Sequence, residues 1–574
     1  MPMAAIAVNC QSSRCQPGLV PITHVAPKTA SRQTLARQRG TQTRSILYNG
    51  LTSFPRASCK SLVGKGAAFV TSRAPTSDQQ GLHAIVVGGG VMGLFAAQAL
   101  LDTFDRVTLV ERNDPLRATV ASESWEETSN RRSGVPQINQ PHNFLVGGVM
   151  AMEELMPGCR QQLLARGALE LDLGKDVAYH DYGGLFPRCV SGLKGLGVSR
   201  RLLEEELYAY LLSTGGKRLC VIPRTMVTGL AWDANHQTVV GIHCGDGSQL
   251  GADLVVEASG RRSSLPEWLA EKGWAPPPER RVLAKVVAAS LTVSWPEDWD
   301  CHKAFSLYIC KTQPHGKRGG VLLPIEGRAW QLTLAELGGT RAPCTWEGVL
   351  EAAKQLPDPT MHSVLQRCKP LTPVNNYGGW PNIRRCYDLC PLPRGLLVVG
   401  DAVQGLNPVY GQGMTVAAQT ALLLRQQLAE ALAGARDLPA RRRRLAGLSG
   451  QAFQRALATD VLEPAWALAA GTDLRYPTTT VSGPGARRPP ASLTATLDCL
   501  ARVAQRDARI YGLVLAVAHL AAPSRVLLVP RVLFNLAWQL LKEALARASR
   551  RLLGTGAGGR GGEEQEGPVT VAAT

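Results

Sequence analysis

The chain has 574 residues, 45% of them hydrophobic, and a formal net charge of +18. This length leaves room for two or three domains, and the apolar content is ordinary for a globular protein with a sizeable core. No apolar run reaches the roughly 18 residues of a transmembrane helix, so none is expected. The fourteen cysteines form no C-x-x-C pair and no cluster with zinc spacing, which indicates reduced thiols and no metal site.

The basic charge is concentrated in residues 1–77, which contain ten Lys or Arg and no Asp or Glu. This segment is rich in Ser, Thr, Ala and Gln and lacks the apolar core of a secretory signal, a composition typical of an organelle transit peptide. Its length and its many hydroxyl groups favour the chloroplast, with the mitochondrion as the alternative. A disordered basic arm that binds nucleic acid is the competing interpretation, but we expect no nucleic-acid partner.

The first elements after this segment form a predicted β-α-β unit. Short apolar stretches predict strands over His83–Val87 and Arg106–Val110, and small apolar residues predict a helix over Leu94–Leu101. The turn between the first strand and the helix has the pattern Gly-x-Gly-x-x-Gly, and an acidic residue follows the second strand. A preceding strand and a following helix are the context that a dinucleotide-binding fingerprint requires.

Each residue of this fingerprint has a separate physical role. Gly88 permits the tight turn, Gly90 lets a pyrophosphate approach the backbone, and Gly93 lets the helix pack close to the sheet. The helix N-terminus then offers free N–H groups to phosphates. Glu111, which Arg112 follows, is placed at the end of the second strand to accept hydrogen bonds from a ribose. These five residues are the candidate contacts to the ADP half of a dinucleotide.

The middle of the chain predicts further helices and strands, and strands dominate from about residue 282 onward. In chain order we expect helices near Phe144–Leu155 and at Ser199–Leu212, strands at Thr225–Trp232, Val239–Cys244, Leu254–Glu257, Lys285–Val293, Ala304–Ile309 and Trp330–Ala335, and a helix at Trp346–Gln355. We interpret the later strands as a second sheet inserted into the first domain.

The last part of the chain returns to helices. An apolar strand at Gly395–Val399 precedes a long helix expected from Met414 to about Leu432. The chain from there to Arg551 has a helical pattern, with breaks expected at Pro464, Pro477–Pro490 and Pro523. Residues 554–574 are Gly-rich and then acidic, which predicts a disordered tail.

Basic and apolar residues occur together in this C-terminal region. The run Arg441–Arg444 is interpreted as a solvated helix face. Alternatively, it joins Leu513–Leu545, where apolar residues mix with Arg and Lys, in a surface that contacts an anionic membrane.

A second motif lies in the segment from Gly395 to Met414, which resembles the Gly-Asp motif of the para-hydroxybenzoate hydroxylase-like flavoproteins. The resemblance implies that Asp401 contacts the ribityl chain of FAD and that the following Pro and Gly residues line the isoalloxazine ring. A reduced flavin is anionic near N1 and O2, and the predicted helix N-terminus would stabilise that charge. The implied FAD contacts in this segment are Gly400, Asp401, Pro408, Gly411, Gly413 and Met414.

Other segments between about residues 84 and 432 are similar to the same family. The run from Arg132 to His142 resembles the loop after the second strand, and Arg200 matches a family Arg that reaches the cofactor. His142 either contacts flavin or substrate or packs within its own loop. Residues 252–266 match a strand and turn in which the family usually has Asp-Gly. Ser259 replaces that Asp here, which leaves flavin binding as the expectation but weakens the case for direct reduction by NADPH.

Several residues that could carry chemistry stay unassigned. Tyr377, Arg384, Arg385 and Tyr387 either line the substrate side or serve surface and packing roles. No nucleophile–base pair is apparent, so the catalytic residues are unknown. The chain also lacks a second nucleotide-binding β-α-β unit between residues 150 and 400, which argues against a disulfide reductase.

These observations predict an α/β fold, in which a Rossmann-like FAD-binding domain holds an inserted mostly-β substrate domain and precedes a C-terminal helical region. The expected boundaries are the transit peptide at 1–77, the FAD-binding domain at 78–264 and 391–435, the substrate domain at 265–390, the helical region at 436–553 and the tail at 554–574.

The family resemblance implies an FAD-dependent monooxygenase that hydroxylates or epoxidises an apolar or aromatic small molecule with oxygen and NAD(P)H. An FAD-dependent isoprenoid reductase or carotenoid cyclase-like enzyme is the alternative within flavin chemistry. A non-catalytic flavin-binding protein is the alternative outside it. The sequence contains no signal for the identity of the substrate or for the oligomeric state.

Overall fold

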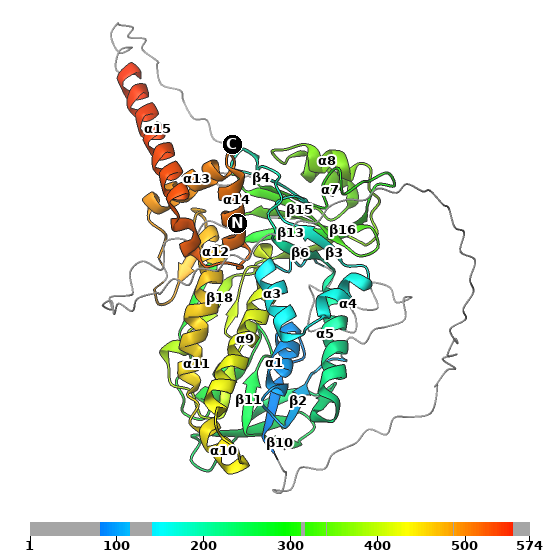
Figure 1. Cartoon of the computed structure of the whole chain (residues 1–574), viewed down its shortest axis with the longest axis vertical. Helices are drawn as coiled ribbons and strands as arrows, with labels where there is room; N and C mark the ends of the chain where they lie inside the picture. The colour runs from blue at the N-terminus through cyan, green and yellow to red at the C-terminus, as the bar shows by residue number, and fades with distance from the viewer. Residues whose placement is uncertain (1–80, 115–139, 312–315, 340, 486, 555–574) are drawn as a thin grey trace, which may run out of the picture. The chain divides into compact units, whose positions relative to one another are not determined.

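The computed structural model describes residues 81–114, 140–311, 316–339, 341–485 and 487–554 (Figure 1). The predicted transit peptide, the segment Arg132–Gln137 and most of the predicted tail lie outside these residues. All described residues belong to one compact unit.

A five-stranded parallel sheet is the base of this unit. Its strands lie in the order β19 (Leu396–Val398), β11 (Leu254–Glu257), β1 (His83–Val87), β2 (Arg106–Val110) and β7 (Leu219–Ile222). Most residues of these strands are apolar, because helices and a small second sheet cover both faces. The predicted Rossmann-like arrangement is therefore confirmed, including the return of the chain to this sheet after an insertion of about 140 residues.

Helix α1 (Val91–Leu101) lies at the centre of the helical layer, and all eleven of its residues are buried. Figure 1 shows it between α5 (Arg200–Gly215) and α9 (Gly413–Leu432), both of which contact it. A helix enclosed on every side needs apolar residues around its whole circumference, as its sequence has. The helix begins three residues before the predicted start, because Gly90 is its N-cap.

A seven-stranded sheet forms the second layer of the molecule. Its order is β17 (Asn375–Gly378), β13 (Val286–Ser294), β16 (Ala329–Leu337), β15 (Arg318–Ile325), β14 (Leu307–Lys311), β4 (Val177–Asp181) and β5 (Gly184–Leu185). All pairs are antiparallel except β14 with β4. One face packs against α7 (Trp346–Lys354) and α8 (Thr360–Leu365), and alternate residues face the other side.

Two features of this sheet differ from the predictions. Strands β4 and β5 belong to it, although the expected boundary places them in the FAD-binding part, and their apolar residues pair with β14 far along the chain. The pattern also did not predict β15, because two glycines and Pro324 interrupt it. Gly320 is needed there, since a Cβ at this position would lie 2.6 Å from the Met361 sulfur.

Smaller sheets complete the fold. The order β10 (Gln249–Gly251), β9 (Val239–Cys244) and β8 (Val227–Trp232) forms an antiparallel sheet beside the parallel one, while β3 (Leu169–Asp172) pairs with β6 (Lys194–Gly197). A four-stranded sheet has the order β20 (Gln404–Gly405), β18 (Asn382–Arg385), β12 (Glu279–Leu283) and β21 (Thr480–Ser482). The last strand belongs to the C-terminal region, so that region is not purely helical.

The C-terminal region contains α10 (Leu438–Ala446), α11 (Gly450–Leu457), α12 (Glu463–Asp473), α13 (Ala491–Ala504), α14 (Ala508–Ala518) and α15 (Pro530–Gly554). The expected break at Pro464 is wrong. A π-helical turn at Ala458–Leu462 joins α11 to α12, and Pro464 lies in the first turn of α12. Proline fits this position because its missing N–H and fixed φ are tolerated at a helix start.

The basic run at the start of this region is only partly solvated. Arg441 donates to Asp105 at 2.8 Å and to the carbonyl of Thr103 at 2.6 Å, and Arg442 donates to Asp253 at 3.0 Å. These bonds attach α10 to loops of the parallel sheet. Arg442, Arg443 and Arg444 are exposed, as the interpretation of a solvated face expects, whereas Arg441 is partly buried against the loop before β2.

Candidate cofactor site and adjoining cavity

The glycine turn after β1 has the geometry that its three roles require. Gly88 has φ +101°, and a Cβ there would lie 2.7 Å from the carbonyl oxygen of Ala258. A Cβ on Gly93 would overlap the carbonyl oxygen of Gly88, so α1 packs directly on the turn. At Gly90 a Cβ would meet no atom within 4 Å. The backbone at Gly90 therefore faces open space, as the approach of a phosphate requires.

Helix α1 begins at this open space without a side-chain cap. Its first N–H groups are consequently available to an anion, and the helix dipole favours negative charge at the same place. Glu111 is buried at the end of β2 and accepts hydrogen bonds from the N–H groups of Gly89 at 2.6 Å and Asn113 at 2.9 Å. Arg112 is exposed on the following loop. Contact of these residues with a ribose stays a prediction.

Asp401 lies between the N-termini of two helices that are far apart in the sequence. Gly400 has φ +64°, and a Cβ there would lie 2.6 Å from Met92 in the first turn of α1. A Cβ on Gly413, the first residue of α9, would lie 4.0 Å from a carboxylate oxygen of Asp401. The Asp401 side chain is 42% exposed, so it faces the open space and not the packed core.

Positive charge surrounds this carboxylate. Arg261 lies 3.9 Å from it and also donates to the carbonyls of Pro381 and Leu406. The surrounding protein partly removes the Asp401 carboxylate from bulk water, which raises its pKa. The positive charges of Arg261, Arg200 and Arg385 lower it. Sequence reasoning missed Arg261 because no spacing rule connects it with Asp401.

Arg200 lies at the N-terminus of α5, where it donates to Glu204 at 2.7 Å. Its charge acts on Asp401 and also on His142. Burial and then the Arg200 charge lower the pKa of His142 to about 3, and its Nδ1 lies 2.6 Å from the Gln140 carbonyl. The structure therefore brings a neutral His142 near Arg200 and bonds it to its own loop, so both interpretations of His142 stay open.

The loop from Asn407 to Gln412 leads from the parallel sheet to α9. Pro408 is exposed, and Gly411 has φ +63° and would place a Cβ 3.0 Å from Asn143. The Gln412 N-cap makes no side-chain cap bond, so the first N–H groups of α9 are free to meet a negatively charged ring edge. Met414 is buried in the core, so only its backbone is available to a cofactor.

A buried carboxylate that sequence reasoning missed fixes this loop. Asp473, at the end of α12, accepts hydrogen bonds from Tyr410, from Asn407 at 3.1 Å and from Asn382 at 2.7 Å. Asn382 in turn accepts a bond from the Asn407 N–H at 2.7 Å. The C-terminal region thus holds the loop from behind. No motif marks Asp473, because its partners lie 63 to 91 residues earlier in the chain.

The turn after β11 contains Ser259, which stands where the resembled family usually has Asp. The Ser259 hydroxyl donates to Glu257, which also accepts from Ser263 at 2.8 Å. Burial raises the pKa of Glu257, and these bonds lower it. Ser259 is thus engaged inside the turn. In addition, Arg385 donates to the carbonyls of Ala402 and Arg261, each at 3.0 Å.

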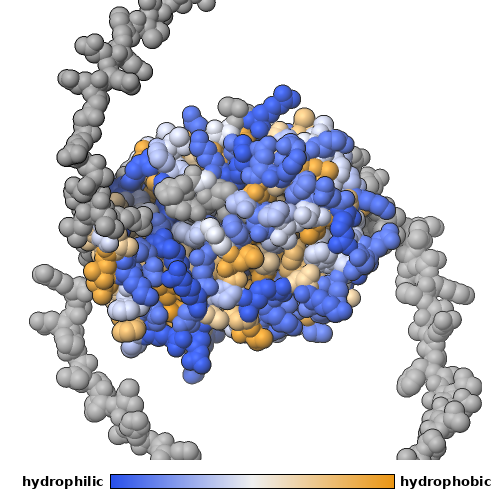
Figure 2. All heavy atoms as spheres, turned by 90° about the horizontal axis from the view of Figure 1, so that it is seen from above, coloured by the Kyte–Doolittle hydropathy of each residue, from blue (hydrophilic) through white to orange (hydrophobic). Residues whose placement is uncertain are grey.

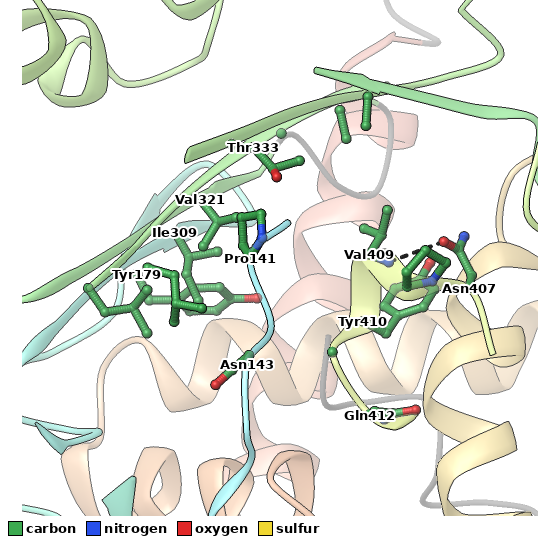
Figure 3. A pocket seen from close by; sticks show the side chains of 18 of the residues that line it. Pro141, Asn143, Tyr179, Ile309, Val321, Thr333, Asn407, Val409, Tyr410 and Gln412 are labelled. Atoms are coloured by element: carbon green, nitrogen blue, oxygen red, sulfur yellow. Dashed lines mark hydrogen bonds between the residues drawn. The ribbon is translucent and has the colours of Figure 1, made fainter. Parts of the chain in front are cut away.

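A cavity of about 210 Å³ adjoins the Asn407–Gln412 loop. Figure 3 shows Ile309, Val321 and Thr333 on the sheet side, and Asn407, Val409, Tyr410 and Gln412 opposite them. Most lining side chains are aliphatic or aromatic, and they come from the seven-stranded sheet, the loop and α14. The aromatic members are Tyr179, Tyr182, Phe186, Tyr377, Trp380, Tyr410, Tyr476 and Tyr511.

The aromatic and basic residues that the sequence left unassigned before β19 divide into two groups. Tyr377 lines the cavity, as one interpretation expected. Arg384 and Tyr387 are fully buried, and Arg384 pairs with Glu463 at 2.5 Å and Asp388 at 3.5 Å. These two residues have packing roles, because their side chains lie within the four-stranded sheet region and not at the cavity.

His519 is a third functional candidate that sequence reasoning missed. It lies directly after α14 and lines the cavity, and burial lowers its pKa to about 3, so the imidazole is neutral. Its Nδ1 is buried and forms no hydrogen bond with any residue that the structure describes. The backbone at this turn is fixed, since the His519 carbonyl accepts from Gly147 at 2.9 Å and Gln419 donates to Leu520 at 2.8 Å.

The arrangement fits FAD by its own geometry. The features that suit it are two uncapped helix N-termini, an open backbone at Gly90, a buried acid at the end of β2 and a half-exposed Asp401 near both helix ends. Within the described part of the chain, no group of three or more His, Cys, Asp or Glu side chains is arranged to hold a metal ion.

Comparison with known proteins agrees with this assignment. A family model described as FAD binding domain matches residues 221–440, and one described as pyridine nucleotide-disulphide oxidoreductase matches residues 83–135. The flavin-dependent brominase Bmp2 shares the fold with a TM-score of 0.50, at 13% identity, over 82% of this chain and 100% of the brominase chain. The chain therefore contains an FAD binding domain and is an FAD-dependent oxidoreductase.

This flavoprotein is also similar to proteins with known sequence or structure from bacteria. Protein Rv3254 of Mycobacterium tuberculosis is 29% identical over 362 residues, which are 60% of this chain and 73% of that protein. PqsL of Pseudomonas aeruginosa, solved with 2-aminobenzoylacetate, has a TM-score of 0.47 at 17% identity and covers 69% of this chain and 97% of its own.

The open space at Gly90 leads to a prediction for FAD binding in this flavoprotein. Gly90→Ala should leave the melting temperature of the flavin-free protein unchanged, because the new methyl group meets no atom. It should weaken FAD binding about tenfold or more, since the methyl group occupies the approach of the pyrophosphate. Titration of flavin fluorescence measures the affinity. Gly93→Ala is the contrasting control, which should lower both stability and affinity, and equal FAD affinity of Gly90→Ala and the wild type would contradict the assignment.

The buried Asp473 predicts a pH-dependent stability. Burial raises its pKa from 3.8 to about 6. A carboxyl group that holds its proton more tightly when folded favours folding at low pH, so its contribution to stability falls as the pH rises from about 4 to about 6. Asp473→Asn cannot ionise and should lack this fall, which amounts to at most about 3 kcal/mol. Melting temperatures across this pH range test the difference. The exposed Asp460→Asn serves as control, and parallel profiles of Asp473→Asn and wild type would disprove the effect.

Proposed function

We propose that this flavoprotein is an FAD-dependent monooxygenase that hydroxylates or epoxidises an apolar or aromatic small molecule with oxygen and NAD(P)H. The observation that carries the proposal is the apolar cavity beside the Asn407–Gln412 loop, at the end of the candidate FAD site. FAD-binding sites of enzymes place the reactive part of the cofactor against a concave apolar pocket for the substrate. The position and lining of this cavity support a substrate of that kind.

The chain contributes position and environment to this chemistry. Bound FAD supplies the redox and oxygen chemistry. The N-terminus of α9 favours negative charge at the adjoining ring edge, and the bonds of Asp473 keep the loop before α9 in place. The aliphatic and aromatic walls exclude water from the reacting atoms. No general acid or base needs to be assigned among the cavity residues.

A second candidate function is reduction or cyclisation of an isoprenoid or carotenoid. The observation in its favour is Ser259, which stands where the family usually has Asp and is bonded to Glu257 inside the turn. If that position no longer takes part in the handling of NADPH, the flavin receives its electrons in another way. A non-catalytic flavin-binding role is the third outcome that experiments should distinguish.

We also propose that the chain acts in the chloroplast, with the mitochondrion as the alternative. The support is the basic, hydroxyl-rich and acid-free composition of residues 1–77. An organelle location would suit an oxidoreductase that acts on lipid-soluble molecules.

The decisive experiment is the anaerobic absorption spectrum of the flavin-loaded protein before and after addition of NADPH or NADH. For a monooxygenase we expect the nicotinamide to bleach the flavin bands. Oxygen uptake should follow when air is admitted together with an aromatic probe such as 2-naphthol. A flavin that neither nicotinamide reduces, with or without the probe, would overturn this proposal in favour of the reductase, cyclase or non-catalytic roles.

His519 narrows the class of substrate. A neutral imidazole with a buried, unbonded nitrogen is costly in an apolar wall unless a ligand bonds to the ring. We therefore propose that the substrate is a mostly apolar molecule with one hydrogen-bonding group, such as a hydroxyl or a carbonyl, that meets this imidazole.

A matched pair of probes tests this role by binding alone. 2-Naphthol and 2-methylnaphthalene differ in one hydroxyl, and their affinities follow from the perturbation of the flavin spectrum. In His519→Leu the ratio of the two affinities should shift about tenfold toward 2-methylnaphthalene, because the hydrogen bond is lost. Val514→Ala, in the same wall, should weaken both probes equally. An unchanged ratio in His519→Leu would remove His519 from the site.

A further inference from the structure

Helix α15 exposes a continuous apolar face. It follows α14 after the short helix η8 (Ser524–Leu528), and Figure 1 shows it leaving the body of the fold. Phe534 is 71% exposed, Trp538 51% and Leu545 61%, and Leu533 and Leu541 are about half exposed. Large apolar side chains stabilise a protein when they are buried, so the exposure of several of them on one helix needs an explanation.

These side chains lie on one side of the helix, away from the protein. At 3.6 residues per turn, Phe534, Trp538, Leu541 and Leu545 fall within an arc of about 60°. The opposite side attaches α15 to α13: Glu543 accepts from Arg502 at 3.0 and 3.1 Å, and Gln539 accepts from Arg506 at 3.0 Å. The helix is thus held by polar bonds on one side and is open on the apolar side.

Positive charge accompanies the apolar face. The helix contains Arg531, Lys542, Arg547, Arg550 and Arg551 and one acidic residue, Glu543, which faces Arg502. Arg531 pairs with Asp507 at 2.7 Å and the charge of Arg547 acts on Glu543, so these two arginines already have acidic neighbours. The Lys542 ammonium lies 5.2 Å from the centre of the Trp538 ring, so a cation borders the apolar arc directly. Amphipathic helices with an aromatic apolar side and basic flanks typically lie in the plane of anionic membrane surfaces.

We propose that α15 docks this protein on an anionic lipid bilayer, with its axis parallel to the surface. The occupant is a membrane and not a second copy, because an isologous contact would bring the lysine and arginine residues of both copies together. The helix lies on the surface and does not cross it, since none of the described helices is long and apolar enough to span a bilayer. Figure 2 shows this end of the molecule, where apolar patches alternate with hydrophilic side chains.

The membrane contact would connect with the cavity through one apolar cluster. This cluster contains Val514 and Leu515 of α14, which line the cavity, together with Leu527 of η8 and Val532 of α15. A lipid-soluble substrate would then have a short route from the bilayer to the cavity wall. The docking itself does not depend on the proposed function.

Flotation of the full-length, flavin-loaded protein with vesicles tests the proposal. Vesicles of phosphatidylcholine with about one third phosphatidylglycerol should carry the wild type, and phosphatidylcholine vesicles should carry much less. The triple variant Phe534→Glu, Trp538→Glu, Leu541→Glu should bind the anionic vesicles at least about tenfold more weakly. The matched control Leu212→Glu, Met226→Glu, Leu371→Glu changes the same charge at exposed apolar residues elsewhere and should bind like the wild type.

Both triple variants carry residues 1–77, so that basic segment contributes equally to their binding. Equal flotation of the α15 variant and the control would overturn the proposal. Light scattering shows whether the wild type is a dimer. If it is, and the α15 variant is a monomer that still binds the vesicles, the apolar face belongs to a contact with a second copy. An unchanged flavin spectrum and melting temperature show that the variants are folded, and none of the readouts requires activity.

Discussion

The direct backbone contact between α1 and the turn before it is the constraint on which the site depends. Because Gly93 carries no side chain, the first turn of α1 rests on the carbonyl of Gly88, and the uncapped helix end points at the open backbone of Gly90. The same end of α1 contacts Gly400 through Met92, which places Asp401 next to the glycine turn. Four glycine positions in two distant segments therefore set the distance between the two parts of the candidate cofactor site.

The C-terminal region contributes residues to the candidate site. Asp473 bonds to the loop before α9 from behind, and α14 forms one wall of the cavity. Three side chains donate hydrogen bonds to the buried Asp473 carboxyl group, and these bonds hold the loop in one conformation. Burial of the charged carboxylate lowers the stability of the protein at neutral pH. The same region continues into α15, whose exposed apolar side connects the chemistry of the cavity with a lipid surface in our proposal.

The two halves of the site differ in their physical character. The FAD half is polar and built from backbone groups, helix ends and charged residues such as Asp401, Arg261 and Arg200, which suits a cofactor with phosphates and hydroxyls. The adjoining cavity is mostly apolar and aromatic, and the Nδ1 atom of His519 in its wall bonds to no described residue. This division is consistent with chemistry supplied by the flavin and selectivity supplied by the shape of the cavity.

The sequence by itself determined the β-α-β unit, the parallel sheet, the long helix α9 and the residues of both flavin motifs, because glycine spacing and apolar periodicity act over a few neighbouring residues. It did not predict β15, the assignment of β4 to the substrate sheet, or the roles of Asp473 and His519. These features depend on partners far away in the chain, such as Asp473 with Asn382. Only the tertiary structure decides them, since a buried carboxylate or imidazole has no local pattern until the fold surrounds it.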